Sequence, residues 1–179
     1  MQTAVSSRMA TVPAVACAAE LQAPAVTVET RRPAAISAAD YALDSAAIRT
    51  VRFAVFVDEQ AVPANLEMDD RDPHCFHVLA HVADEAVGTG RIDIDEASRS
   101  ARVGRMAVLA GYRGDGIGAR LLEALHEHAR QRDCVEVWCH AQLAAQSFYA
   151  RAGYVAEGGV FVEAGIDHIT MRRSLQQRP

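Results

Sequence analysis

The sequence contains no lysine, so all 18 of its basic residues are arginine. No side chain can therefore form a Schiff base through an ε-amino group, hold a phosphate as an ammonium ion or undergo self-acetylation. Cysteine is also scarce, with four in 179 residues and no C-x-x-C pair. This excludes a disulfide framework and predicts a reducing, cytoplasmic compartment. No apolar run approaches the ~20 residues that a transmembrane helix requires, so no membrane partner is expected.

The chain carries a small excess of negative charge. With 23 acidic residues against 18 basic ones, its formal net charge is −5 and its pI is about 5.8. Such a surface repels phosphate backbones, which excludes general nucleic-acid binding. At roughly 150 residues per domain, a chain of 179 residues that is half apolar suffices for one domain with one core.

The composition divides the chain into three parts. Residues 1–23 are rich in alanine, serine and proline, which predicts a flexible leader. The apolar run Met9–Ala19 within it is a poor secretory signal, because it is rich in alanine and interrupted by Pro13. Residues 24–175 form the expected domain, and residues 176–179 form a short tail.

Hydrophobic periodicity predicts a mixed α+β fold. The expected elements, in chain order, are a strand at 25–30, a turn at 33–37, a helix at 40–56, strands at 76–82, 87–94 and 101–109, a helix at 117–129, a strand at 135–140, a helix at 143–152 and a hairpin of 155–162 with 166–173. The middle strands are typical of an antiparallel meander. The segment after them is typical of a strand, glycine loop, helix and strand at the centre of the domain.

The glycine-rich segment Arg113–Gly118 (R-G-D-G-I-G) lies between a predicted strand and an amphipathic helix. Glycines there allow the backbone to approach a ligand closely, and the first turn of the helix presents unpaired N–H groups with a partial positive charge. These features indicate an anion site, although a plain glycine turn would have the same sequence. The segment has neither the G-K-[ST] of a Walker loop nor the G-x-G-x-x-G of a Rossmann fold.

Three motifs resemble the GNAT family of acyl-CoA-dependent N-acyltransferases. Met106–Leu122 is similar to motif A of that family, with its [RQ]-x-x-G-x-[GA] core. Gln142–Tyr154 (Q-L-A-A-Q-S-F-Y-A-R-A-G-Y) resembles the family's N-x-x-A-x-x-F-Y-x-[KR]-x-G-[FY] motif, at the expected separation. Upstream, Arg52–Gln60 resembles the R-x-x-V-F-V-x-E-Q box of one small branch. Two positions depart from the family pattern, with Gly111 in place of proline and Gln142 in place of asparagine.

The resemblance implies a GNAT-like fold, a mixed and mostly antiparallel twisted sheet with helices on both faces. It also implies that the strand ending at Val108 and the strand at 135–140 splay apart, with the thioester of acetyl-CoA in the gap. Strand backbone would bind the pantetheine arm, loop amides would bind the pyrophosphate, and no metal ion is needed. The residues implied to bind acetyl-CoA are Met106, Ala107, Val108, Arg113, Gly114, Asp115, Gly116, Ile117, Gly118 and Ala119.

The implied reaction moves an acetyl group from acetyl-CoA directly to the amino group of a small molecule. An alkylammonium with a pKa of ~10.4 must first lose a proton, which favours a general base. A strand amide near Val108 could stabilise the oxyanion. Tyr149 matches the family's general acid, which protonates the leaving thiolate, but it could also be a core aromatic residue beside Phe148.

An acidic segment at 66–72 supplies candidates for the base and for the acceptor site. It carries four carboxylates against one arginine, and it is either a solvated loop or an acidic wall of the substrate site. On the second interpretation Glu67 or Asp69 is the catalytic base or the anchor of the substrate's ammonium group, and Asp70 also binds that group.

Glu59, in the upstream box, is the competing candidate for the catalytic base. It could also be a structural carboxylate paired with Arg52 or Arg91. The sequence pattern does not decide between these roles.

Seven histidines raise the question of a metal site. His77 and His81 would share one face of a strand, but four residues at ~3.3 Å each place them about 13 Å apart. One metal ion cannot bridge that distance, so ordinary strand and loop histidines are expected. His126 and His128 are expected on the surface of the helix after the glycine loop.

Two other functions stay open from the sequence. The spacing Glu67-x-Asp69-x-x-Asp72 resembles an acidic pattern of acyl-homoserine-lactone synthases, which share the fold. A non-catalytic acyl-CoA-binding module would keep the glycine loop without needing Tyr149. The acceptor amine cannot be named from the sequence, and the resemblance also allows a homodimer, because family members often dimerise.

Overall fold

Seven strands in the order β1-β2-β3-β4-β5-β7-β6 form one sheet within residues 33–175, the part of the chain that the computed structural model describes. The strands are β1 (Ala35–Ala39), β2 (Phe76–Val82), β3 (Glu85–Asp95), β4 (Ser100–Val108), β5 (Glu136–Gln142), β6 (Val155–Glu163) and β7 (Ile166–Ser174). Neighbouring strands are antiparallel except β4 and β5, which are parallel. The predicted α+β fold with a mostly antiparallel sheet is confirmed.

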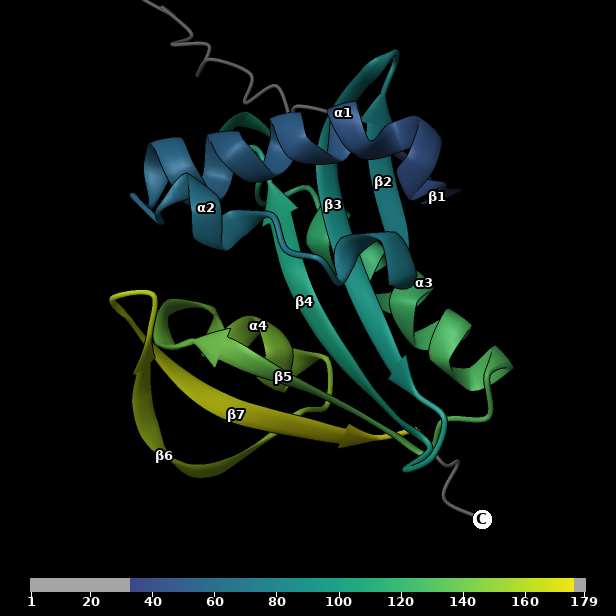
Figure 1. Ribbon diagram of the computed structural model, residues 1–179, viewed down its shortest axis with the longest axis vertical. Helices are drawn as coiled ribbons and strands as arrows, with labels where there is room; N and C mark the ends of the chain where they lie inside the picture. The colour runs from purple at the N-terminus through teal and green to yellow at the C-terminus, as the bar shows by residue number, and fades with distance from the viewer. Residues whose placement is uncertain (1–32, 176–179) are drawn as a thin grey trace, which may run out of the picture. The chain divides into compact units, whose positions relative to one another are not determined.

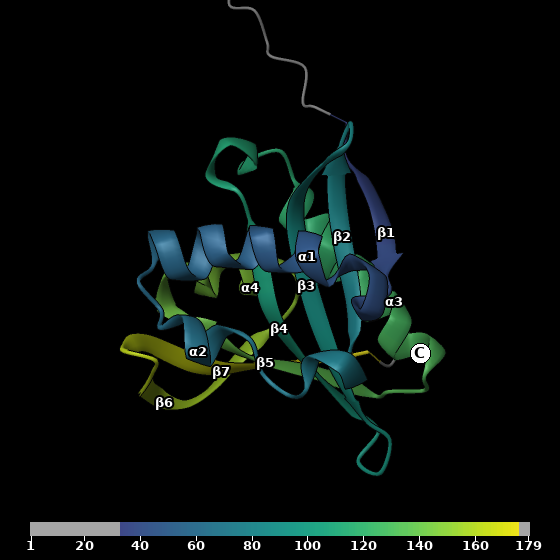
Figure 2. The ribbon, with the colours of Figure 1, turned by 45° about the horizontal axis from the view of Figure 1, so that its top comes forward.

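Helices lie on both faces of the sheet. They are α1 (Tyr41–Arg52), the short α2 (Ala64–Glu67), α3 (Ile117–Gln131) and the short α4 (Gln146–Arg151). A π-helical segment, Phe53–Glu59, continues α1. Figure 1 and Figure 2 show α1 and α2 in front of the sheet and α3 behind it, so the central strands are covered on both sides.

Local sequence explains the two long helices. Asp40 caps α1, because its carboxylate accepts a hydrogen bond of 2.9 Å from the Ala42 N–H. In α3 the apolar side chains at helical spacing form a buried stripe against β2, β3 and β4, as the 3.6-residue period predicts. The members of this stripe are Ile117, Leu121, Leu122, Leu125 and Ala129.

The N-terminal part of the domain differs from the sequence prediction. The strand expected at 25–30 lies outside the described residues. At 33–37, where the pattern predicts a turn, the structure begins β1, which pairs with β2 from Ala39 opposite His77 to Ala35 opposite His81. This short segment has no alternating pattern of its own, and the available edge of β2 determines its conformation. The helix expected at 40–56 is α-helical only to Arg52.

The parallel strands β4 and β5 separate along their length. Their ladder contains only the pairs from Ser100 opposite Glu136 to Arg102 opposite Trp138. Beyond these pairs the two strands diverge, as Figure 1 shows. Beyond these three pairs, the facing backbone groups of β4 and β5 are not paired with each other. The sheet therefore has a gap at its centre.

A bulge shapes β4 next to this gap. The β3–β4 register shifts between Thr89 and Arg91, which leaves an extra residue in β4. Arg105 there has a left-handed φ of 53°, which costs a non-glycine residue about 1 kcal/mol. Its guanidinium donates hydrogen bonds to the carbonyl oxygens of Leu66 (3.2 Å) and Glu67 (3.1 Å), which ties the bulge to α2.

Candidate active site

Two cavities meet where β4 and β5 separate. One, of about 940 Å³, is bounded by the end of β4, the glycine-rich turn, the first turn of α3 and α4, and we call it the glycine-turn cavity. The other, of about 610 Å³, lies among the π-helical segment, α2, β4, β5 and the β6–β7 hairpin, and we call it the arginine-lined cavity. Its arginines are Arg71, Arg91, Arg102, Arg105 and Arg113. The residues bordering both cavities are Met106, Ala107, Val108, Arg113, Ala145 and Tyr149.

The glycine-rich turn presents free backbone N–H groups to the glycine-turn cavity. Gly114 and Gly116 have φ of 89° and 78°, which glycine adopts without strain. A Cβ added to either residue would meet nothing within 4 Å. Within residues 33–175, no group accepts a hydrogen bond from the N–H groups of residues 114–119. With the positive end of the α3 dipole, they form a site that fits phosphate oxygens.

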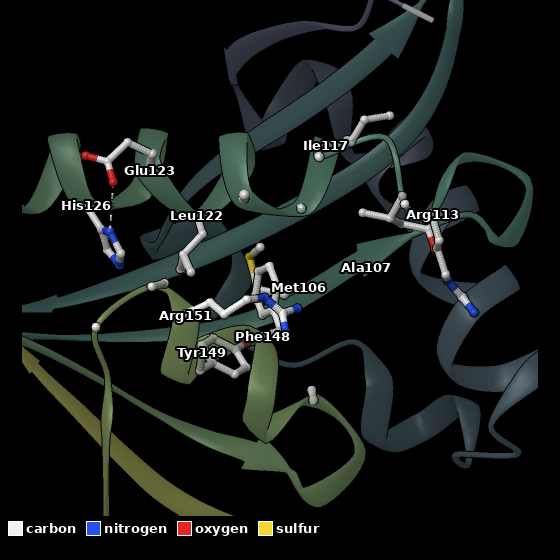
Figure 3. A pocket seen from close by; sticks show the side chains of 18 of the residues that line it. Met106, Ala107, Arg113, Ile117, Leu122, Glu123, His126, Phe148, Tyr149 and Arg151 are labelled. Carbon is white, nitrogen blue, oxygen red and sulfur yellow. Dashed lines mark hydrogen bonds and ion pairs between the residues drawn. The ribbon is translucent and has the colours of Figure 1, made fainter. Parts of the chain in front are cut away.

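The lining of the glycine-turn cavity includes nearly all of the residues that the sequence predicts for acetyl-CoA. Asp115 is the exception, because it does not line the cavity. Figure 3 shows Leu122 of α3 on one side of the cavity and Phe148 and Arg151 of α4 on the other. The start of α3 packs closely on α4, since a Cβ added to Gly118 would be in van der Waals contact with the Phe148 ring, at 3.4 Å.

The end of β4 offers one N–H group toward the gap. The Leu109 N–H donates a hydrogen bond of 2.9 Å to the Val87 carbonyl of β3. Successive residues of an antiparallel strand direct their N–H and C=O groups to opposite sides, so those of Val108 face the gap. The Val108 carbonyl accepts a hydrogen bond of 2.9 Å from Arg113 Nε on that side. Its N–H group is therefore placed to bind an oxygen of a ligand in the gap.

Glu59 and Gln60 bridge the two sides of the gap. The Glu59 carboxylate accepts bidentate hydrogen bonds from Arg113, at 2.7 and 2.6 Å, and these lower its pKa. Its partner is thus Arg113, not the Arg52 or Arg91 considered from the sequence. Gln142 Nε2, at the end of β5, donates to Gln60 Oε1 at 2.8 Å. Sequence reasoning missed this amide pair, although Gln142 was already a departure from the family motif.

Tyr149 stands at the junction of the two cavities. Its ring is buried on α4 and makes edge contacts with Phe148 and Tyr154. Burial raises the pKa of its phenol far above the ordinary value, so the hydroxyl is protonated at neutral pH. No hydrogen-bond partner of this hydroxyl occurs among the described residues. The group is thus a neutral donor at the border of both cavities.

The acidic segment at 66–72 is largely a buried ion-pair cluster rather than a solvated loop. Glu67 and Asp72 are buried. Arg52, also fully buried, donates to the carboxylates of Glu67 and Asp72, at 2.8 Å for the second. Arg91 Nη1 lies 2.6 Å from both Asp69 and Asp72. Within the segment itself, acidic residues outnumber basic ones. In the folded protein, arginines from other elements neutralise this negative charge.

The predicted acceptor-side carboxylates therefore differ in their surroundings. Burial raises the pKa of Glu67 despite the opposing charges of Arg52 and Arg105. Burial also acts on Asp69, but the hydrogen bond and charge of Arg91 outweigh it and lower the pKa. Glu67 and Asp69 line the arginine-lined cavity, and the exposed Asp70 does not.

His126 is buried, so its predicted surface position is wrong. Its ring nitrogens lie 2.8 Å from the Tyr154 hydroxyl and 2.9 Å from Arg173 Nη1. Burial, with the charge of Arg173, lowers its pKa to about 4. His128 stacks on Phe76 with ring centroids 3.7 Å apart. The buried face of α3 therefore includes His126 in addition to the aliphatic residues of the apolar stripe.

The other expectations concern a metal ion and the membrane. Within the described part of the chain, no group of three or more His, Cys, Asp or Glu side chains is arranged to hold a metal ion. Among the helices of residues 33–175, none has both the length and the apolar character needed to cross a bilayer.

Comparison with known proteins agrees with this geometry. Residues 37–175 match the family model of the acetyltransferase (GNAT) domain. The Bacillus subtilis protein YyaT is 31% identical over 130 residues, which cover 71% of this chain and 86% of YyaT. The crystal structure of an acyl-CoA N-acyltransferase from Pseudomonas aeruginosa is 30% identical, with a TM-score of 0.69 over 79% of this chain and 99% of that one.

A structural likeness also exists to the acyl-homoserine-lactone synthase BjaI. Its TM-score is 0.64 over 81% of this chain and 85% of BjaI, at 16% identity, which shows a shared fold alone. The family model, in contrast, spans most of the chain and includes all the residues that line the two cavities. The chain therefore belongs to the GNAT family of acetyltransferases and is an acyl-CoA-dependent N-acyltransferase.

Proposed function

We propose that the protein transfers an acetyl group from acetyl-CoA directly to the amino group of a small molecule in the cytoplasm. The observation that supports this most is the junction of the two cavities at Val108 and Tyr149. A thioester in the glycine-turn cavity and an amine in the arginine-lined cavity would meet there. Direct transfer requires this arrangement, because both substrates must be bound at once.

The glycine-turn cavity suits the donor. Acetyl-CoA supplies the activated acyl group as a thioester and carries a pyrophosphate between its pantetheine and its adenosine. The free N–H groups of residues 114–119 would hold the pyrophosphate, and Gly114 and Gly116 allow its close approach. The backbone of Met106–Val108 would hold the pantetheine arm along the open edge of β4.

The groups at the junction fit the steps of acyl transfer. The amine nitrogen attacks the thioester carbon, and the Val108 N–H would donate to the oxygen that becomes negative. When the C–S bond breaks, the electron pair stays on sulfur, and the Tyr149 hydroxyl would supply the proton that this thiolate takes. We infer that Tyr149 is the general acid, because its hydroxyl is neutral and has no partner among residues 33–175.

The carboxylates that the sequence suggests as bases are all engaged with arginine. Glu59 is bound to Arg113, Glu67 to Arg52, and Asp69 to Arg91. The guanidinium partners lower the pKa of Glu59 and Asp69, which weakens both carboxylates as bases. Burial raises the pKa of Glu67, but its carboxylate accepts a hydrogen bond from the buried Arg52. We propose that Glu59 and Glu67 hold the walls of the site, and that Asp69 contributes negative charge near the acceptor.

Replacing Tyr149 with phenylalanine tests this function. Tyr149→Phe should lower kcat by ~10² or more, because the thiolate loses its proton donor, while affinity for acetyl-CoA stays similar. The measurement is release of free CoA from acetyl-CoA with a panel of primary amines that includes S-adenosylmethionine. Tyr154→Phe is the matched control, since this buried hydroxyl binds His126 and borders neither cavity.

Three outcomes would count against the proposal. A Tyr149→Phe variant with the wild-type kcat would leave this residue with a packing role only. Acetyl-CoA binding without turnover on any amine would favour the non-catalytic binding module. Turnover confined to S-adenosylmethionine would favour an activity of the acyl-homoserine-lactone-synthase kind.

A milder substitution separates Glu59 from the chemistry. Glu59→Gln keeps the shape of the side chain and removes its charge. We expect less than about 1 kcal/mol of lost stability, because the Glu59–Arg113 pair is exposed. The kcat should stay within about fivefold of the wild type, far from the loss of ~10² that removal of a general base would cause. Steady-state kinetics with saturating acetyl-CoA measure this, and a fall of ~10² would return the base role to Glu59.

A further inference from the structure

Four polar side chains from four strands line the arginine-lined cavity. They are Arg102 of β4, His140 of β5, Glu163 of β6 and His168 of β7. We propose that His140, held by Glu163, is the general base that takes the proton of the acceptor ammonium group. The proposal rests on the proposed N-acetyltransferase function and extends it to a residue that the sequence motifs do not single out.

The contact between His140 and Glu163 determines which ring nitrogen is free. His140 Nδ1 lies 2.7 Å from Glu163 Oε2. Burial acts to raise the pKa of Glu163, but the hydrogen bond and the positive groups around it outweigh burial and lower the pKa. The carboxylate is therefore ionised and can only accept, so Nδ1 carries the hydrogen and Nε2 carries the lone pair.

Arg102 lies beside the same pair and competes with Glu163 for His140 Nδ1. Its Nη2 lies 3.2 Å from His140 Nδ1, but a guanidinium cannot donate to a nitrogen that already carries a hydrogen. It pairs instead with Glu163 Oε1 at 3.7 Å and lies over the Trp138 ring at 5.2 Å. Arg102 and His140 thus share one carboxylate, which fixes the position of Glu163.

The free nitrogen of His140 is accessible. Val137, Cys139 and Ala141 of β5 are buried, whereas His140 lies on the opposite face of the strand and borders the cavity. Within residues 33–175, only His77 Nδ1 is both buried and without a hydrogen-bond partner. His140 Nε2 also has no hydrogen-bond partner in that range, yet it is not among the buried atoms. Solvent therefore reaches this nitrogen. Edge contact with Phe161, at a centroid distance of 4.8 Å, holds the ring.

The charges around His140 favour a base at this position. The groups that face it from neighbouring elements are Arg102, Glu163 and His168, and only Glu163 touches it through a short hydrogen bond. An imidazole with a free ring nitrogen can accept a proton from the ammonium group and release it to water afterwards. The ammonium proton would pass to Nε2, the nitrogen lone pair would attack the thioester, and Glu163 would stabilise the imidazolium.

The experiment is a pH–rate profile of kcat/KM for the amine with the highest turnover in the panel, at saturating acetyl-CoA. His140→Gln should lower kcat/KM by ~10² or more and remove the acidic limb of the profile. Glu163→Gln should shift that limb toward lower pH, because the imidazolium loses its carboxylate partner. His74→Gln is the control, since this exposed histidine borders neither cavity.

A second readout does not depend on the acceptor. Long-range ¹H–¹⁵N NMR of the free protein should show His140 with its hydrogen on Nδ1, and Glu163→Gln should weaken that preference. A hydrogen on Nε2 instead would overturn the proposal, as would an unchanged profile in His140→Gln or loss of the acidic limb in His168→Gln alone. If the wild-type protein acetylates no amine, the proposed function fails and this role fails with it.

Discussion

Gly116→Glu is expected to weaken acetyl-CoA binding by ~100-fold or more, about 3 kcal/mol of binding free energy. Gly116 opens α3 at a φ of 78°, and a side chain added there would extend into open space beside the free N–H groups. A glutamate at this position brings a carboxylate to the site that would hold the pyrophosphate. Repulsion and steric exclusion then act together, and isothermal titration calorimetry with acetyl-CoA measures the loss.

Gly158→Glu is the matched control for this substitution. Gly158 on β6 has a similar φ of 75°, also has nothing within 4 Å of an added Cβ, and borders neither cavity. Both variants carry the same backbone strain of about 1 kcal/mol, but only Gly116→Glu blocks the turn. Equal acetyl-CoA affinity in the two variants would remove the glycine turn from the donor site.

Arg52→Met is expected to lower the free energy of unfolding by about 3–5 kcal/mol. The guanidinium of Arg52 is fully buried and binds the buried carboxylates of Glu67 and Asp72. Methionine fills a similar volume but leaves these carboxylates without their main partner, which is far more costly than the loss of an exposed pair. Urea denaturation at neutral pH gives the difference.

Arg132→Met provides the comparison for Arg52→Met. Arg132 pairs with Glu96 on the surface, where both side chains are exposed, so less than about 1 kcal/mol should be lost. Similar losses in the two variants would show that the buried cluster adds no more than a surface pair.

The buried cluster also has a signature in acid. Burial acts to raise the pKa of Asp72, but the hydrogen bonds and charges of Arg52 and Arg91 outweigh it and lower the pKa. A carboxylate with a lowered pKa stabilises the fold above its unfolded value of ~3.9, and this contribution disappears as the pH falls through the folded pKa. Stability of Arg52→Met should therefore depend less on pH below about 4 than that of the wild type.

The features that sequence analysis predicted well are those encoded by neighbouring residues. The stripe of α3 follows from side chains three and four positions apart, and the turn before it follows from closely spaced glycines. The antiparallel meander of β2, β3 and β4 was also predictable. In each case the deciding interactions lie within one element or between consecutive ones.

The features that sequence analysis missed depend on partners far apart in the chain. Arg52, Glu67 and Arg91 come from three different elements, and only the folded sheet brings them together. Counting charges within one loop therefore left a solvated loop and an acidic wall as the two interpretations, and neither included the buried cluster. The contact between His140 and Glu163 was missed for the same reason, because the two residues belong to different strands. The roles of Glu67, Glu59, Asp69 and Asp70 in the reaction stay predictions.

The bridge formed by Glu59 and Gln60 has a consequence for how this scaffold can change. Two adjacent residues of one segment hold Arg113, which borders both cavities, and Gln142, which borders the arginine-lined cavity. Inserting or deleting a residue just before them would rotate both side chains away from their partners at the same time. The scaffold should therefore tolerate no change of length between Phe53 and Gln60.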